Sequence, residues 1–231
     1  MCGRFVVTLP PEAVRAFFAY AEQPNFPPRY NIAPTQPIPV VTAQPMSGGA
    51  TRHFILMRWG FLPGFVADPK KFPLLINARV EGLAEKTSFR AAVRRRRCLV
   101  IADGFYEWRR GPGAIKRPFL IHRADGDPMG FAGLYETWSD ASGGEIDTAC
   151  IITTSANALM AQIHDRMPAI IPRSEHSRWL DNDGVEPAKA MQLARPAPEG
   201  DLELIEIGPA VNKSANDGPE LQTPLSEALV S

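Results

Sequence analysis

Apolar residues along this chain come mostly in short runs, and glycine, proline and aspartate separate the runs. Runs of this kind that are rich in β-branched and aromatic side chains predict β-strands. They are densest in the second half of the chain. The predicted strands are residues 3–7, 54–59 and 74–80, followed by CLVIADGFYEW, PFLIHR, MGFAGLYETW, DTACIITT, MPAII and LELIEI.

A few segments show the spacing of an amphipathic helix instead. The first such helix opens at Pro10-Pro11-Glu12, since proline is tolerated in a first helical turn, and its apolar face consists of Val14, Phe17, Phe18 and Ala21. The stretch from Pro24 to Pro45 holds many prolines, which favour extended, loop-like or edge-strand structure. Further short helices are predicted from a Thr87-Ser88 cap to about Arg96, from an Asn157 cap to near His164, over 174–181 and over 186–194.

These elements predict the fold class and the domain organisation. Runs of strands with only short helices between them favour an α+β fold dominated by antiparallel strands. No internal repeat and no low-complexity linker divides the sequence. We therefore expect a single domain over residues 1–222 and an irregular tail over 223–231.

Composition indicates the cellular compartment of the protein but not a binding partner. Hydrophobic residues make up 45% of the 231 residues and charged residues 22%, as in ordinary globular proteins. No 18-residue apolar run is present, and the start MCGRFVV lacks the basic flank of a secretory signal. We expect a cytoplasmic protein with no membrane segment, nucleoid-associated when it binds DNA, and a monomer as the simpler state.

Charge is balanced overall and clustered at one place. The 25 basic residues equal the 25 acidic residues, so net charge does not point to a nucleic-acid partner. The run Arg94-Arg95-Arg96-Arg97 is the clearest local cluster. It is either an anion-binding patch or a solvated helix end favoured by the helix dipole.

The three cysteines divide into two kinds. Cys98 and Cys150 lie inside apolar runs, which is typical of buried core thiols. Neither the cysteines nor the four histidines show the spacing of metal ligands, so we expect no metal and no cofactor. Cys2 is different, because removal of Met1 would leave an α-amine and a thiol on one residue.

That pair is suited to one kind of chemistry. A free α-amine has a pKa of about 7.7–8.0, so part of it is neutral and nucleophilic near neutral pH. The amine and the thiol can both add to a single aldehyde carbon and close a five-membered thiazolidine ring. Arg4 places a fixed cation two residues away. The alternative reading is a buried cysteine near the chain terminus.

Four other polar groups lie inside apolar runs, where each needs a partner. Asn77 and Arg79 are two apart, so a strand places the amide and the guanidinium on one face. Glu107 lies between aromatic residues that would raise its carboxyl pKa. The remaining two are His164, between a helix and a strand, and Thr153, at the end of a buried strand.

Each of these groups has a structural alternative. Asn77 could cap a turn, Arg79 could form an ion pair with Glu81 or Glu107, and His164 could satisfy helix carbonyl groups. Glu107 could face solvent. Together with Cys2 they make up the inventory of a covalent site: a nucleophile, an amide, a carboxylate and an imidazole.

A series of motifs spans nearly the whole chain. In order these are MCGRF, RYNIAPTQ, WGFLPG, LINARVE, SFR, RRCLVIADGFYEW, PFLI, FAGLYE, CIITTSAN, IHDRMPAII and NDGPEL. This series resembles the SOS-response-associated peptidase (SRAP) family, the abasic-site shield proteins, over about residues 2–222. The resemblance implies a barrel-like fold, loss of Met1 by self-processing, and a thiazolidine crosslink between Cys2 and an abasic site in single-stranded DNA.

The resemblance also implies a role for each matching residue. Cys2 would be the nucleophile, Asn77 would orient it, Glu107 would move protons during Schiff-base formation, and His164 would protonate the sugar ring oxygen. Arg4, Arg79 and Thr153 match residues that hold phosphates. Pro34, Phe65 and Trp108 match positions against which bases pack. Phe65 stands where tryptophan is common, Ile101 stands where proline is common, and the segment before Val211-Asn212 lacks a basic residue often seen there.

Two other functions remain open at this point. One is a cysteine peptidase that acts on other proteins with Cys2 as nucleophile and His164 as base. The other is a module that binds single-stranded DNA without a covalent step, through Trp108, Phe65 and the arginines.

Overall fold

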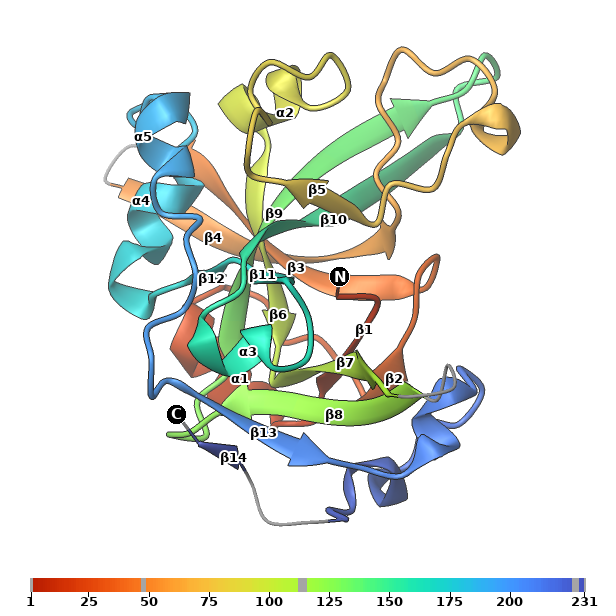
Figure 1. The fold of residues 1–231 in the computed structure, drawn as a ribbon. Helices are drawn as coiled ribbons and strands as arrows, with labels where there is room; N and C mark the ends of the chain where they lie inside the picture. The colour runs from red at the N-terminus through yellow and green to blue at the C-terminus, as the bar shows by residue number, and fades with distance from the viewer. Residues whose placement is uncertain (1, 47–48, 112–115, 226–228, 231) are drawn as a thin grey trace.

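The computed structural model describes residues 2–46, 49–111, 116–225 and 229–230. Two β-sheets make up the body of the molecule (Figure 1). In the larger sheet, β10, β4, β3, β6 and β9 pair in turn and β9 pairs again with β10, so these five strands close a barrel. The larger sheet contains β3 (Pro37–Met46), β4 (Gly49–Trp59), β5 (Asn77–Arg79), β6 (Arg97–Ala102), β9 (Met129–Ser139), β10 (Glu145–Ser155), β11 (Arg166–Pro168) and β12 (Ile170–Ile171).

The smaller sheet has the order β14-β13-β8-β7-β1-β2, and its neighbouring strands pair antiparallel. The α+β class with mostly antiparallel strands is thereby confirmed. One detail of the tail differs from expectation, because β14 pairs with β13 inside the segment predicted to be irregular. The strands are β1 (Arg4–Val7), β2 (Arg29–Ile32), β7 (Gly104–Arg110), β8 (Lys116–Arg123), β13 (Leu202–Glu206) and β14 (Leu229–Val230).

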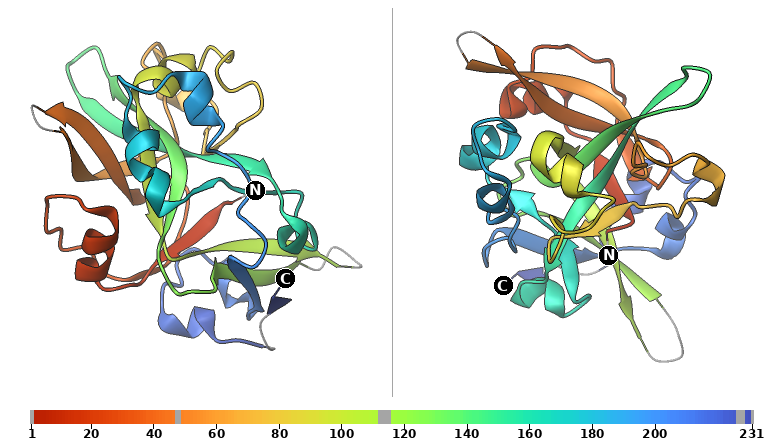
Figure 2. Two further views of the ribbon diagram at one scale, coloured as in Figure 1. Left: turned by 90° about the vertical axis from the view of Figure 1, so that its left-hand side faces the viewer. Right: turned by 90° about the horizontal axis from the view of Figure 1, so that it is seen from above.

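Short helices lie on the outside of the sheets, and Figure 2 shows the long β9–β10 hairpin projecting from the body. The Asn157 cap is confirmed, since its Oδ1 accepts from the Met160 amide over 3.0 Å. The Thr87-Ser88 cap is wrong: the helix begins at Arg90 after Phe89, with no side-chain cap. The helices are α1 (Pro11–Phe18), α2 (Arg90–Arg95), α3 (Ala158–Ala161), α4 (His176–Leu180) and α5 (Pro187–Met191), with 3-10 turns η1 (Pro69–Lys71), η3 (Arg173–Glu175), η4 (Pro209–Asn212) and η5 (Pro219–Gln222).

The proline-rich stretch became strand at two places. β2 is at the edge of the smaller sheet, as predicted, but β3 lies within the barrel between β4 and β6. Only Val40 and Val41 of β3 pair with β6. The prolines of β3 lie outside that paired stretch, so their missing N–H groups cost no hydrogen bond to β6.

Aromatic side chains join the two sheets into one core. Phe5 of β1 is fully buried, with ring centroids 5.1 Å from Trp59 of β4 and 6.2 Å from Phe131 of β9. Phe105 of β7 meets the same Phe131 at 5.8 Å. Edge-on aromatic contacts of this kind add about 0.5–1.5 kcal/mol each beyond the area they bury. They pack β1 and β7 of the smaller sheet against the barrel (Figure 1).

The run of four arginines does not act as one cluster. Arg97 is fully buried, and its guanidinium donates to carbonyl oxygens, among them those of Val93 and Trp179 at 2.8 Å. Arg96 Nε lies 2.9 Å from Glu136 Oε1. The two arginines before it are exposed. The helix-end reading holds for Arg94 and Arg95, which are exposed in the last turn of α2, but not for Arg97, which is part of the core.

Cys98 and Cys150 are buried free thiols, as predicted. No helix among the described residues is long and apolar enough to cross a membrane.

Candidate functional site

Cys2 lies at the start of β1 and is fully buried. Its backbone carbonyl oxygen accepts from Asn77 Nδ2 over 2.7 Å, and its thiol approaches the carbonyl oxygen of Arg4 at 3.8 Å. The main chain and the side chain of Cys2 are therefore both held by neighbours.

Asn77 is placed by the pairing of β5 with β10. The two strands run parallel with Asn77 opposite Ile151, and the Ile76 carbonyl accepts from the Ile151 amide at 3.0 Å and from Trp59 Nε1 at 2.9 Å. Asn77 Oδ1 is buried and has no hydrogen-bond partner in the described part of the chain. An unused acceptor buried beside Cys2 suits a site that a substrate group completes.

Glu107 comes from β7, which pairs with β1. Arg4 is opposite Tyr106, so the next residue along β7 lies level with the start of β1. Glu107 is only 5% exposed. Burial raises the pKa of the Cys2 thiol well above its ordinary value, and the negative charge of Glu107 raises this pKa further. The thiol is consequently protonated at neutral pH.

His164 and Arg166 form a second group, just before and at the start of β11. His164 Nδ1 accepts from the backbone amide of Arg166 over 3.0 Å, which places the ring proton of the neutral imidazole on Nε2. Asp165 Oδ1 lies 2.9 Å from the same Nδ1.

Arg166 connects His164 with the Arg79 end of β5. Its guanidinium binds both carboxylate oxygens of Glu81, at 2.6 and 2.8 Å, and donates to the Thr153 carbonyl at 2.6 Å. Arg79 is exposed and lies opposite Thr153 in the pairing of β5 with β10. The Thr153 side chain itself is fully buried, with its hydroxyl 3.5 Å from the Ala78 carbonyl, so its phosphate contact stays a prediction.

Arg4 is half-buried and anchored at one side. Its Nη1 donates to Asn31 Oδ1 and to the Val211 carbonyl, both at 2.9 Å. Trp108 is also anchored, since its indole Nε1 donates to Asn212 Oδ1 over 2.7 Å. Both residues contact the segment around Val211-Asn212.

Pro34 and Phe65 lie in loops, Pro34 between β2 and β3 and Phe65 after β4. Pro34 is half-buried in a turn that the Thr35 amide ties to the Trp59 carbonyl at 2.8 Å. Thr35 has a φ of 74°, which is strained for a β-branched residue and marks a turn held by its surroundings. Phe65 is 63% exposed, as a stacking platform requires. The contacts described for Cys2 involve neither the Pro34 ring nor the Phe65 ring.

Asn31, Glu81 and Arg166 were not given roles by sequence reasoning. Arg166 was noted only as a neighbour of His164, and Glu81 only as an ion-pair alternative for Arg79. Asn31 lies in the motif RYNIAPTQ and its partner Asn216 in NDGPEL, which were the available signal, whereas its partners Val211 and Lys213 lie outside both motifs.

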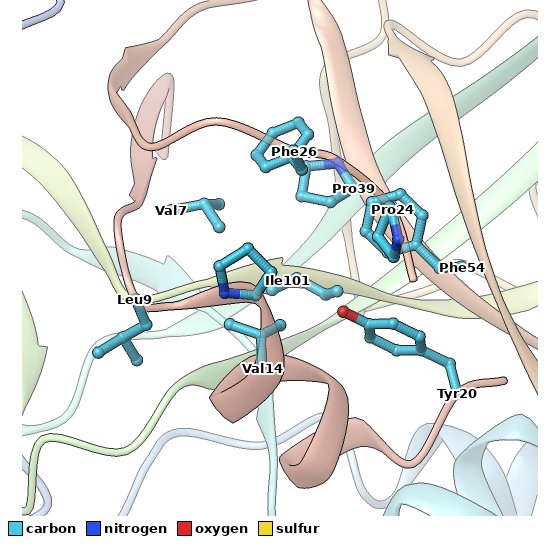
Figure 3. Close-up of a pocket in the computed structure, with 10 residues that line it drawn as sticks. Val7, Leu9, Val14, Tyr20, Pro24, Phe26, Pro39, Phe54 and Ile101 are labelled. Atoms are coloured by element: carbon cyan, nitrogen blue, oxygen red, sulfur yellow. The ribbon is translucent and has the colours of Figure 1, made fainter. Parts of the chain in front are cut away.

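A separate hollow between α1, β3 and β4 is not part of this site. Figure 3 shows Tyr20, Phe26 and Phe54 around it, and its volume is about 10 Å³. That is the room of a single water molecule at most. Its lining offers only the Tyr20 hydroxyl as a titratable group, so it does not compete as a reaction site.

The fold and the site define a class: a small barrel protein with a cysteine, an amide and a carboxylate gathered where the chain starts. A family model described as SOS response associated peptidase (SRAP) matches residues 1–214, and the chain belongs to this family.

Relatives and solved structures agree with this assignment. The chain is 35% identical over 224 residues to abasic site processing protein YoqW of Bacillus subtilis, covering 96% of this chain and 98% of that protein. It is 31% identical to abasic site processing protein HMCES of Xenopus tropicalis, covering 95% and 77%. A crystal structure of a protein from Bacteroides thetaiotaomicron superposes with a TM-score of 0.83 at 27% identity, covering 97% of this chain and 100% of that one.

Proposed function

We propose that this chain processes abasic sites in single-stranded DNA by forming a covalent thiazolidine crosslink through Cys2. The observation that carries the proposal is the Asn77 hydrogen bond to the Cys2 carbonyl next to the Glu107 carboxylate. It gathers, around an aminothiol precursor, the groups that an aldehyde reaction needs. The family and its relatives, which are named abasic site processing proteins, agree with that substrate.

The order of the two nucleophiles follows from their protonation states. Hydrolysis of the Met1–Cys2 bond gives a free α-amine with a pKa of about 7.7–8.0. The thiol, in contrast, has a raised pKa and stays protonated. The amine therefore attacks the aldehyde carbon of the ring-opened sugar first, and loss of water gives an imine.

The thiol then closes the ring. Glu107 takes the thiol proton, the sulfur bonds to the imine carbon, and the imine nitrogen receives a proton. The reaction balances, because the product contains all the atoms of the aldehyde and of Cys2 except those of the one water that is lost. A carboxylate next to a protonated thiol is suited to this transfer.

Asn77 and His164 act on either side of this step. Asn77 Nδ2 fixes the Cys2 main chain, and Asn77 Oδ1 accepts from the amine or from the hydroxyl that forms on attack. His164 with its proton on Nε2 serves as the acid that protonates the sugar ring oxygen as the ring opens. Reversal of the crosslink would use the same groups in the opposite direction.

Binding of the DNA strand falls to groups around the nucleophile. Arg4, Arg79 and Thr153 would hold phosphates, while Pro34, Phe65 and Trp108 would pack against bases. A protein with no net charge recognises the lesion locally. Binding should weaken with salt and depend little on base sequence.

Crosslinking to a synthetic oligonucleotide tests the proposal. Wild-type protein mixed with single-stranded DNA that carries one abasic site should give a heat-resistant adduct on a denaturing gel, and its intact mass should lack Met1. Cys2→Ala should give none, whereas the matched control Cys150→Ala should still crosslink. Retention of Met1, or no adduct from the wild type, would end the proposal.

A peptidase function is a second candidate, supported by the family's description. The buried, protonated thiol disfavours it as a general activity, because a cysteine peptidase attacks with a thiolate. Self-removal of Met1 would be its minimal form. Cleavage of unrelated peptides that depends on both Cys2 and His164 would instead favour this candidate.

A further inference from the structure

Two segments far apart in the sequence are locked together beside Arg4. Asn31 on β2 is fully buried, and its amide nitrogen donates to the carbonyl oxygens of Val211, Lys213 and Asn216 at 3.2, 3.1 and 2.9 Å. One buried side chain thus binds three main-chain carbonyl groups of a segment 180 to 185 residues further along the chain. We refer to residues 211–217 as the latch segment.

The latch segment holds β2 in return. Asp217 accepts from the backbone amides of Tyr30 and Asn31 at 2.5 and 2.9 Å, and Arg29 Nε donates to its other carboxylate oxygen at 2.5 Å. β2 is an edge strand, and this carboxylate satisfies amides that would otherwise have no strand partner.

Arg4 forms hydrogen bonds both with Asn31 and with the latch segment. Its Nη1 donates to Asn31 Oδ1 and to the Val211 carbonyl, and its Nη2 donates to the Asn212 carbonyl at 3.4 Å. The orientation of the Asn31 amide is fixed, because Arg4 requires the oxygen on one side and the three carbonyls require the nitrogen on the other.

These contacts use one edge of the Arg4 guanidinium and leave the other edge without hydrogen bonds in the described part of the chain. Arg4 has five N–H donors, and both of those on Nη1 are taken. In the described part of the chain, Nε and the second Nη2 hydrogen have no partner. That remaining edge is a fork of two parallel N–H groups, the geometry that binds two oxygens of one phosphate.

The same segment also orients the Trp108 ring. Asn212 accepts from the indole nitrogen of Trp108, which fixes the rotation of the ring about its side-chain bonds. The latch segment therefore orients both the Arg4 guanidinium and the Trp108 ring.

We infer that Asn31 is a positioning residue that, through the latch segment, presents the Nε–Nη2 edge of Arg4 to a phosphate of the bound strand. The inference rests on the proposed function, since it names how that site holds its DNA. Asn31 touches no reacting atom and acts through Arg4.

Asn31→Ala tests the inference directly. It frees Nη1 and the latch segment, so Arg4 samples other directions and the crosslinking rate at subsaturating abasic DNA should fall about tenfold, as for loss of one charge-assisted hydrogen bond. The slope of log affinity against log salt should become shallower by about one phosphate contact. Reaction of the protein with a small aldehyde such as propanal should stay within about twofold of the wild type, since the Cys2 chemistry is untouched.

A double-mutant cycle shows whether the effect runs through Arg4. If it does, Arg4→Ala with Asn31→Ala should crosslink no more slowly than Arg4→Ala alone. Fully additive losses, or an unchanged salt slope in Asn31→Ala, would overturn the inference. Wild-type protein that fails to crosslink would sink the proposed function instead, so the two failures are distinguishable.

A second variant covers the case in which Asn31→Ala does not fold. Asp217→Ala removes the carboxylate that joins the latch segment to the Tyr30 and Asn31 amides. Like Asn31→Ala, it should lower the crosslinking rate and make the salt slope shallower. The matched control is Asp140→Ala, which removes a similar turn-holding carboxylate from the β9–β10 hairpin, where Asp140 accepts from the Ser142 and Gly144 amides. Equal behaviour of Asp217→Ala and Asp140→Ala would contradict the positioning role.

Discussion

The side-chain amide of Asn77 donates to the backbone carbonyl oxygen of Cys2 over 2.7 Å. This bond ties the start of the chain to β5, which is itself fixed by its parallel pairing with β10. The carbonyl carbon is bonded to the Cα that carries both the amine and the thiol. Holding it therefore holds both nucleophiles.

Asn77→Ala should slow crosslinking about 100-fold, because small misplacements of reacting groups cost factors of this size. Equilibrium binding of undamaged single-stranded DNA should change little, since the phosphate contacts are made elsewhere. Single-turnover crosslinking and fluorescence-anisotropy binding separate the two quantities. Asn25→Ala, a change at an exposed asparagine, is the control. A variant that binds weakly but crosslinks at the normal rate once bound would refute this role.

The sequence predicts much of the fold and two of the polar groups that lie beside Cys2. Apolar runs rich in β-branched and aromatic residues predict most of the strands, and polar residues inside such runs indicated Asn77 and Glu107. In the structure Asn77 donates to the Cys2 carbonyl, and the charge of Glu107 acts on the Cys2 thiol.

The rest depends on contacts that no local pattern encodes. Barrel closure requires the parallel pairing of β4 with β10, where Arg58 lies opposite Thr148. Asn31 finds its partners 180 to 185 residues away. Thr153 lies beyond the pairings that close the barrel, where β10 runs between β5 and β11, and alternation along a strand does not tell which of its faces meets solvent.

Arg97 offers a stability prediction. Its fully buried guanidinium donates to the carbonyl oxygens of Val93, Trp179, Asp181 and Val185, and so joins α2 to the segment after α4. Arg97→Leu leaves these carbonyl oxygens without the guanidinium donor. It should lower the free energy of unfolding by about 3 kcal/mol or more. Urea denaturation measures it.

Arg94→Ala is the matched control from the same run of arginines. This residue is exposed, so its loss should change the free energy of unfolding by less than about 0.5 kcal/mol. Similar losses in the two variants would show that the run stabilises the protein through its total charge, which contradicts the carbonyl contacts of Arg97.

His176 should make stability depend on pH. It is fully buried and stacks on Phe18 at 5.3 Å with its Nε2 donating to the Ile171 carbonyl, while Nδ1 has no partner among the described residues. Burial, followed by the charges of Arg52 and Arg173, lowers its pKa to about 4. The unfolded chain, with a histidine pKa of about 6.5, binds the proton more readily.

The sign follows from this difference. Between pH 6.5 and pH 4 the unfolded state holds more protons, so the contribution of His176 is fully present above about pH 6.5 and declines as the pH falls toward 4. The loss over this window should be about 3 kcal/mol. His176→Gln should flatten this part of the profile in urea denaturation, and an equally steep profile in the variant would assign the pH dependence to other groups.

Glu107 provides a prediction in which two rates move in opposite directions. Its charge is the second cause, after burial, of the raised Cys2 thiol pKa. Glu107→Gln removes the charge, so the thiol ionises more easily and its alkylation profile should shift to lower pH, though not to that of an exposed cysteine. Crosslinking should nevertheless slow about 10²-fold, because the group that takes the thiol proton is gone.

The rate of iodoacetamide alkylation against pH, with Cys2→Ala as the background, and gel-based crosslinking measure these two effects. Glu136→Gln, at a glutamate paired with Arg96, should change neither. An alkylation profile that stays in place, or moves to higher pH, would separate Glu107 from the thiol and remove it from the reaction.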